Sequence, residues 1–506
     1  MTKKYATSGV LLLALLLGGC AQLPSVGPDY AVPALPMPSG WQAQTPIQVR
    51  DQAPKPKPPP TLDPATATAT ATATAPVPDL ARWWRQLDDP MLDRLVTEAL
   101  ASNLDVRLAQ SRLRQARAAR GQSVSGYFPT LTASTASNRN SPAKVISAVT
   151  GRTIYDAGFD ASWEVDLFGG TRRAVEAATA DQAATEAALE NARVSLVAEV
   201  AQNYVEVRSY QQRLSIARDN LASQSETLQI TDWRYQAGLA SSSDVEQARS
   251  NREQTRAGMP DLEIGLSAAE NRLAVLLGRH PGALHAELLN AQPLPVVKAT
   301  IGAGIPADVL RQRPDLMAAE RTLAAETARV GQKLAARYPS LSLGGSFGWQ
   351  AYSFAALGGS DTLLRAVSGT LAATLFDGGK LRSAVEIQNA VQEQALISYE
   401  ASVLGALEEV ENGLTAYAAA RERVEARRAA AGAARNAAAL TRDLYQSGLA
   451  DFQKVLETER TRLTTEDNLA TAEATVLTSL IKLYKALGGG WEQPVTAQQL
   501  PEGKTS

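Results

Sequence analysis

The sequence predicts a mainly helical protein with a small membrane-spanning β part, built as an internal two-fold repeat. Residues 210 positions apart match, as Asp105 matches Asp315 and Leu113 matches Leu323. Long stretches without proline repeat apolar residues every seven positions, whereas shorter stretches alternate apolar and polar residues. A register kept over this length indicates that one supersecondary unit occurs twice.

The N-terminus, residues 1–19, has the features of a secretory signal. Lys3 and Lys4 precede the apolar run 10–17, and Cys20, the only cysteine, follows two glycines. This run is too short to span a bilayer, which needs about 20 residues, so a cleaved signal is expected. The pattern resembles a bacterial lipobox, which implies that Cys20 is lipidated. The alternative is an ordinary signal peptide with a chance cysteine. Ala21, by resemblance to lipoprotein sorting rules, implies anchorage in outer membrane lipid.

Residues 20–80 have the composition of a linker. Between Pro24 and Pro78 lie 14 of the 26 prolines, with an Ala-Thr run at 65–75. Such a composition does not form a packed core and favours an extended spacer. Docking of this stretch onto the folded body is the alternative.

Composition also argues against several classes of function. The net charge of -2 provides no basic stripe, so no nucleic-acid partner is expected. His280 and His285 have no cysteine or paired carboxylate beside them, so neither a metal nor another cofactor is expected. Because no nucleophile–base set or phosphate-binding loop is found, the sequence does not predict an enzyme.

The first repeat, residues 81–290, is expected to begin with one helix. Asp89 and Pro90 start an apolar pattern of helical period that continues to about Ala119. Gly121 then ends the pattern.

Two strands are expected in each repeat, at about 128–137 and 153–167, then at about 340–350 and 362–376. In the stretch 153–167 apolar residues alternate with aspartate, serine and glutamate, which suits a wall between lipid and water. Four strands cannot close on themselves, and an open edge in lipid leaves backbone groups unpaired. Closure therefore needs several chains: two give eight strands, three give twelve with room for a lumen. The alternative is two hairpins of a soluble sheet.

A helical hairpin follows the strands of each repeat, at about 172–278 and 381–487. At 1.5 Å per residue, about 60 residues reach roughly 90 Å. Pro260 is expected to kink or split the first return helix. Apolar residues with the seven-residue spacing of a coiled coil are Val200, Val207, Leu214, Leu221, Leu228 and Tyr235, then Val410, Tyr417, Val424, Ala431, Ala438 and Tyr445. The second repeat spans 291–490, and residues 491–506 form a C-terminal tail.

Four arginines, Arg421, Arg428, Arg435 and Arg442, recur every seven residues beside the second apolar series. They predict either a basic line facing a lumen or a solvated face paired with glutamate and aspartate. Alternating charges on a helix favour the paired face.

These features together resemble the outer membrane factor family, the TolC-like exit ducts, and in particular its lipoprotein branch. The resemblance covers Trp83 to Gly488. It is carried by an ordered set of motifs: Leu87-Asp88-Asp89-Pro90-Met91-Leu92, Arg313-Pro314-Asp315, Tyr338-Pro339-Ser340-Leu341, Leu375-Phe376-Asp377-Gly378-Gly379, and two turns of the form Tyr-Gln-x-Gly-Leu.

The resemblance implies a homotrimer in which the hairpins form an α-helical barrel that continues into a 12-stranded β-barrel. It also implies a passive channel of a tripartite efflux system. An inner-membrane transporter of the resistance-nodulation-division type would deliver substrates through a periplasmic adaptor (membrane fusion) protein. Two alternatives stay open: the duct of a type I protein secretion system, and a structural coiled-coil lipoprotein without a channel.

A periplasmic gate is also implied, because in this family acidic side chains line the narrow end near the helix turns. Asp244 follows the first turn, whereas Lys454 stands at the equivalent position of the second and departs from the acidic pattern. The hypothesis is that Asp244 and Lys454 pair at the constriction, with Glu457 as an acidic ring and Asp451 as a further candidate. Such a ring would select cations. The alternative is that these are solvated charges of a coiled coil.

The turns themselves, Gly238-Leu239 and Gly448-Leu449, are predicted to dock the adaptor. Glycine supplies the left-handed conformation that ends a helix, and the leucine places an apolar side chain at the tip. The alternative is that each leucine only covers its own helix end.

Overall fold

The computed structural model describes residues 25–34, 41, 80–140, 152–295 and 307–491. Cys20 and most of the expected linker lie outside the described residues. The chain divides into two compact units, and each takes residues from both sequence repeats. Within the described residues, the sheet unit contains 25–34, 110–140, 152–188 and 315–402, and the hairpin unit contains 41, 80–109, 189–295, 307–314 and 403–491.

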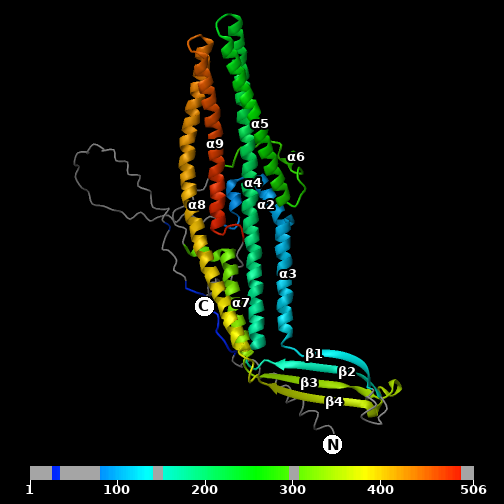
Figure 1. Ribbon diagram of the computed structural model, residues 1–506. Coiled ribbons are helices and arrows are strands. Elements are labelled where there is room, and N and C mark those ends of the chain that lie inside the picture. Colours follow the sequence, from blue (N-terminus) through cyan, green and yellow to red (C-terminus); the bar gives the residue numbers. More distant parts are fainter. Residues whose placement is uncertain (1–24, 35–40, 42–79, 141–151, 296–306, 492–506) are drawn as a thin grey trace, which may run out of the picture. The chain divides into compact units, whose positions relative to one another are not determined.

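The four predicted strands are confirmed, and they form one antiparallel sheet. The strands are β1 (Thr130–Asn140), β2 (Arg152–Val165), β3 (Ser340–Ala351) and β4 (Leu363–Ala372). They lie side by side in sequence order, β1-β2-β3-β4 (Figure 1). Strands from the two repeats therefore meet where β2 pairs with β3.

The strand register gives the sheet one apolar and one polar face. Phe159 lies opposite Phe347, and the next residue, Asp160, lies opposite Ser346. Successive side chains of a strand point to opposite faces, so these pairings of β2 with β3 place apolar residues on one face and polar residues on the other. Val367, on the apolar face, is 94% exposed in the chain. The apolar face is thus largely uncovered.

Strand β4 ends at Ala372, before the expected limit near residue 376. The chain turns at Asp377, whose carboxylate accepts hydrogen bonds from the backbone N–H groups of Gly379 and Leu381, each at 2.8 Å. These bonds satisfy free N–H groups at the beginning of the next helix. They also lower the pKa of Asp377, because they stabilise its charged form.

The expectation of one helix from residue 90 to about 119 is wrong, because the chain forms two helices there. They are α2 (Pro90–Ser102) and α3 (Leu104–Ser125). Between them Asn103 leaves helical geometry, and its side-chain oxygen accepts hydrogen bonds from the N–H groups of Asp105 and Val106. Asn103 therefore caps α3, a role for which asparagine is well suited.

The long helices have equal lengths in the two repeats (Figure 1). Outgoing helices α4 (Gly170–Gln236) and α8 (Lys380–Gln446) contain 67 residues each. Return helices α5 (Ser242–Leu276) and α9 (Phe452–Ala486) contain 35 each. An α-helix of 67 residues is about 100 Å long.

Pro260 does not split α5, which is continuous from Ser242 to Leu276. A proline removes one helical hydrogen bond and frees a carbonyl one turn earlier. Pro260 and Arg256 are both exposed, so water reaches the freed carbonyl. The helix continues for 16 residues beyond the proline, so the expected split does not occur.

The remaining elements are shorter than the long helices, and the last two of them lie between β3 and β4. They are η3 (Trp83–Leu87), α6 (His285–Leu288), η4 (Ala307–Gln312), α7 (Pro314–Ala335), η5 (Phe354–Ala356) and η6 (Ser360–Thr362). In the hairpin unit the indole of Trp83 stacks on Tyr484 of α9 with ring centroids 5.1 Å apart. Burial raises the pKa of Tyr484 to about 12.

No helix within the described ranges is both long enough and apolar enough to pass through a membrane.

Residues 25–34, expected as part of an extended spacer, are docked on the sheet unit. The buried guanidinium of Arg173 donates to Asp29 at 2.6 Å and to Glu176 at 2.8 Å. The backbone at Gly27, with φ +98°, passes so close to Gly331 that a Cβ there would lie 2.4 Å from the Gly331 Cα. Glycine is therefore required at this crossing. For this segment the alternative of docking onto the folded body is therefore the correct one, whereas its prolines favoured a spacer.

Candidate functional site at the hairpin turns

The two hairpin turns have the same backbone geometry. Gly238 has φ +75° and Gly448 has φ +74°. The N–H of Leu239 donates to the carbonyl of Arg234 at 2.7 Å, and the N–H of Leu449 donates to that of Leu444 at 2.8 Å. These bonds and the left-handed glycine are the usual C-terminal end of a helix. The duplicated motif thus forms two equivalent tips.

Each tip exposes its leucine. The side chain of Leu239 is 69% exposed and that of Leu449 is 76% exposed. Within the chain, neither leucine is buried against its own helix end. An exposed apolar side chain at a helix tip is a ready contact for a partner protein.

At the first turn, Asp244 belongs to the cap of α5. The hydroxyl of Ser241 accepts a hydrogen bond from the N–H of Asp244 at 3.2 Å. In return the Asp244 carboxylate accepts from the N–H of Ser241 at 3.0 Å. This reciprocal arrangement is a capping box, which stabilises the beginning of a helix.

At the second turn, the equivalent positions carry different residues. Asp451 caps α9, and its carboxylate accepts from the N–H of Lys454 at 2.9 Å. The ammonium of Lys454 lies 2.8 Å from the carboxylate of Glu457, one turn further along. That hydrogen bond raises the pKa of Lys454. Both side chains of the pair are more than half exposed.

All four gate candidates therefore lie at the tips, and each contacts a neighbour in its own turn. Asp244 and Asp451 cap helices, and Lys454 pairs with Glu457 rather than with Asp244 within the chain. Capping accounts for the two aspartates without a gate. The pairing of Asp244 with Lys454 stays a prediction.

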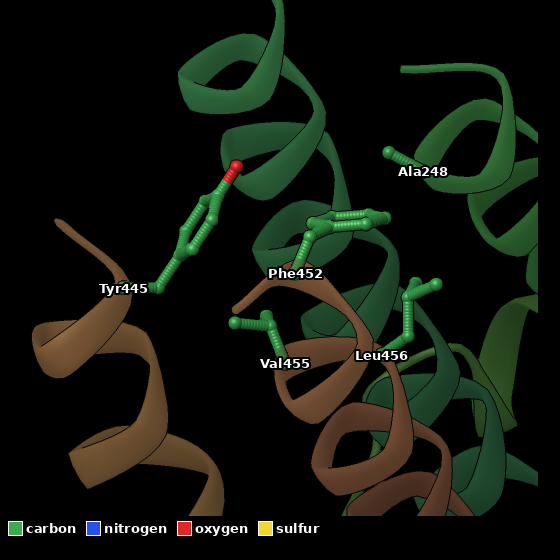
Figure 2. Packing of buried hydrophobic residues seen from close by; sticks show 5 residues of the cluster. All are labelled: Ala248, Tyr445, Phe452, Val455 and Leu456. Atoms are coloured by element: carbon green, nitrogen blue, oxygen red, sulfur yellow. The ribbon is translucent and has the colours of Figure 1, made fainter. Parts of the chain in front are cut away.

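A small apolar cluster joins the two hairpins just behind the tips. Figure 2 shows the members of this cluster: Ala248 of α5, Tyr445 of α8, and Phe452, Val455 and Leu456 of α9. Each of the five is at most 4% exposed. Leu228 and Ile230 of α4 pack against this cluster. The cluster brings all four long helices together.

A polar contact beside this cluster could not be found from the sequence. The guanidinium of Arg234 donates to the carbonyl of Tyr445 and lies 4.5 Å from the centroid of its ring. The hydroxyl of Tyr445 donates to Thr231 at 3.3 Å. In the sequence, Arg234 is only an arginine beside the first seven-residue apolar series, and this position does not reveal which residue it contacts.

Three of the four spaced arginines of α8 pair with carboxylates, as the paired-face interpretation requires. Arg428 contacts Glu425 at 2.7 Å. Arg435 contacts Glu466 of α9 at 2.8 Å, and Arg442 contacts Glu226 of α4 at 3.4 Å. Arg421 lies over the ring of Tyr417.

Comparison with known proteins gives the class of this chain. The model of the outer membrane efflux protein family matches residues 95–279 and 305–489. The chain belongs to this family. The predicted resemblance, the efflux-channel function and the outer membrane localisation are thereby confirmed.

Individual relatives match over nearly their whole length. Nodulation protein T of Rhizobium leguminosarum bv. viciae is 30% identical over 96% of this chain and 94% of its own. Outer membrane protein OprJ of Pseudomonas aeruginosa is 29% identical over 97% of this chain and 98% of its own. The structure of the outer-membrane channel OprN has a TM-score of 0.82 at 34% identity and covers 92% of this chain and 99% of OprN. Members of this family are channels rather than enzymes.

Proposed function

We propose that three copies of the chain close one channel, which completes a tripartite efflux system. The observation that carries this proposal is the open sheet. In the described part of the chain, β1 pairs only with β2 and β4 pairs only with β3. Unpaired edges in lipid cost several kcal/mol per backbone group. Three sheets joined edge to edge have twelve strands, enough for a barrel with a lumen.

The polar face of the sheet suits the inside of such a barrel, and the apolar face suits lipid. The long hairpins would continue the channel on the periplasmic side. An adaptor protein would contact the tips, and an inner-membrane transporter, of the resistance-nodulation-division type in this proposal, would supply substrate. The docked segment and its lipid anchor would fasten the complex to the membrane.

Anchorage through lipidated Cys20 is consistent with the position of the docked segment. Ser25, five residues after Cys20, lies against Gly169 at the beginning of α4. Five residues extend at most about 18 Å. The acyl chains would therefore enter the membrane close to the strands.

The channel is tested by planar-bilayer recording of the purified complex. We expect stable conductance steps, and we expect deletion of the gene to increase susceptibility to toxic compounds. A complex that forms no pore would contradict the proposal. If deletion changes no susceptibility but blocks secretion of a protein, the type I secretion duct replaces efflux.

The tips are proposed to dock the adaptor through Leu239 and Leu449. Substituting both leucines by aspartate is expected to abolish efflux without reducing the yield of trimer. The control is Ser242→Asp with Gln446→Asp, which adds the same charge at exposed neighbouring positions. Unchanged efflux in the leucine variant, or equal loss in the control, would contradict docking.

The gate is proposed at Asp244, Asp451, Lys454 and Glu457. The double variant Asp244→Asn with Glu457→Gln removes two charges, while asparagine retains an oxygen for the capping box. We expect a weaker preference for cations in bilayer recordings. Glu246→Gln is the matched control, since Glu246 is a paired and exposed residue of the same helix. Unchanged selectivity in the double variant would place the gate elsewhere.

A further inference from the structure

Helix α9 carries an acidic series that the proposed gate does not use. Glu459, Glu466 and Glu473 recur every seven residues. Each contacts a polar side chain of α4, and the two further from the turn also contact an arginine of α8. These three levels of contact between α4, α8 and α9 are called rungs below.

The two rungs further from the turn are complete. The carboxylate of Glu473 accepts from Gln212 of α4 at 3.1 Å and lies 3.4 Å from Arg428 of α8. The carboxylate of Glu466 accepts from Asn220 of α4 at 3.1 Å and lies 2.8 Å from Arg435 of α8.

Glu466 has a second cation as well. Arg462, one turn away on α9, lies 3.3 Å from its carboxylate. This side chain of Glu466 is only 6% exposed. Two arginines and one amide donor thus surround the buried carboxylate of Glu466, and such partners offset the cost of burying a polar group.

The rung nearest the turn is incomplete. The hydroxyl of Thr227 donates to Oε1 of Glu459 at 2.6 Å. Oε2 of Glu459 is buried without a partner. Nearby on α4, both polar atoms of the Gln224 side chain are also buried without partners.

The missing partner of Glu459 is identified by the register. A step of seven from Arg428 to Arg435 on α8 matches a step of seven from Glu473 to Glu466 on α9. The next step leads to Arg442 and Glu459. Arg442 instead lies 3.4 Å from Glu226 and 3.3 Å from Ser223 of α4.

The surroundings of Glu459 favour its neutral form. Burial raises the pKa of this carboxyl, although the hydrogen bond from Thr227 and the charges of Arg442 and Arg462 act against the rise. Arg462 is already held by Glu466. From α5, Asn251 faces α9 and accepts from Arg460 at 2.9 Å. Of the two cations, Arg442 is therefore the one that can move to Glu459, because its present partner Glu226 is mostly exposed.

We propose that Glu459 and Arg442 form a two-position switch that couples the packing of α8 against α4 to protonation. With Glu459 neutral, Arg442 stays on Glu226 and the helices remain as observed. With Glu459 ionised, Arg442 moves to Glu459 and completes the third rung. The contact between α8 and α4 at Glu226 is then lost, which loosens the tips. As a gating device the switch rests on the proposed channel function; as a packing change it does not.

The direction of the pH effect follows from the raised pKa. The observed packing binds a proton more tightly than an unpacked carboxyl does, so it is favoured at low pH. Its advantage is lost as pH rises through the raised pKa of Glu459. Each unit of pKa difference between the two packings changes their ratio about tenfold.

Hydrogen exchange on the assembled protein tests the switch. Peptides covering 223–231 and 438–446 are compared between wild type and Glu459→Gln at the same pH, so that the intrinsic exchange rate cancels. At about pH 5 we expect equal exchange, and at about pH 8 we expect exchange about tenfold faster in wild type, equivalent to one unit of pKa difference. Glutamine resembles the neutral acid and should hold the observed packing at both values.

Two further variants distinguish the switch from a general loss of stability. Glu226→Gln removes the alternative partner of Arg442 from an exposed site, so exchange should no longer depend on pH. Glu466→Gln changes the neighbouring rung and should retain the pH response. The proposal is overturned if Glu459→Gln responds to pH as wild type does, or if Glu466→Gln abolishes the response. Because exchange is measured without conductance, a sample that forms no pore still tests the switch.

Discussion

The outgoing helices α4 and α8 share a length and a seven-residue spacing, but they bury different chemistry. In α8 the whole series is buried and almost entirely apolar: Val410, Tyr417, Val424, Ala431, Ala438 and Tyr445. In α4 only the first members, Val200, Val207 and Leu214, are buried. From residue 220 onward the buried positions of α4 are Asn220, Gln224, Thr227 and Thr231, whereas Leu221 and Leu228 are only partly buried.

The difference follows from what faces each helix. Glutamates of α9 contact α4 at Asn220 and Thr227, so α4 must supply hydrogen-bond donors there. A buried polar pair generally contributes less stability than an apolar contact of the same size, but it restricts how two helices can be aligned along their length. We infer that the α8 series mainly stabilises the tips and that the polar part of α4 mainly sets the alignment with α9.

The largest effect is expected in the apolar cluster at the tips. Phe452 is 4% exposed among side chains of three helices, so Phe452→Ala should reduce the free energy of local opening. A loss of about 3–5 kcal/mol is typical for such a truncation. Hydrogen exchange of the first turns of α9 measures it. Leu449→Ala, at an exposed tip, is the control, and an equal loss there would refute the distinction between cluster and tip.

A smaller effect is expected in the polar contacts of α4. Glu466→Ala removes the acceptor of Asn220 and leaves two arginines unpaired, of which Arg435 is exposed and rehydrates. The expected loss is about 1.5–3 kcal/mol. Hydrogen exchange of α9 around residue 466 measures it.

The double variant Asn220→Leu with Glu466→Leu sharpens this comparison. Replacing both partners by apolar groups should recover much of the stability, because no buried donor remains between them. The coupling is obtained from a double-mutant cycle. If the stability losses of the two single variants add to that of the double variant, Asn220 and Glu466 do not stabilise each other.

The smallest effect is expected at the caps, where the two turns use different residues for one task. Ser241→Ala removes the capping box of α5 and should cost about 1 kcal/mol. Asp451→Ala should cost a similar amount in α9, as measured by exchange of each helix's first turn. Ser241→Asn should retain most of the stability. If alanine has no effect at either position, capping does not account for these residues.

Much of this fold is readable from periodicity. Alternation with period two located the four strands, and the seven-residue series located the long helices, because each pattern reports which side of an element is covered. The glycines of the tips were readable because few other residues accept the left-handed conformation. The break between two helices at Asn103 could not be predicted. An asparagine within a helical pattern can cap a new helix or lie on the polar face of a continuous one.

The missed features depend on contacts between elements that are distant in the sequence. The alignment of Glu466 with Asn220 follows from the packing of α9 against α4, which no local pattern specifies. Docking of residues 25–34 depends on the buried Arg173 and on the close approach of Gly27 to Gly331. Composition alone describes that segment as a spacer.

The central claim is that one chain supplies an open sheet that neighbouring chains must close. The most direct test is the mass of the complex extracted from the outer membrane in mild detergent, measured by native mass spectrometry. The account predicts an assembly of three chains with no free single chain in the membrane fraction. A single chain that is embedded in the membrane and conducts ions on its own would contradict it.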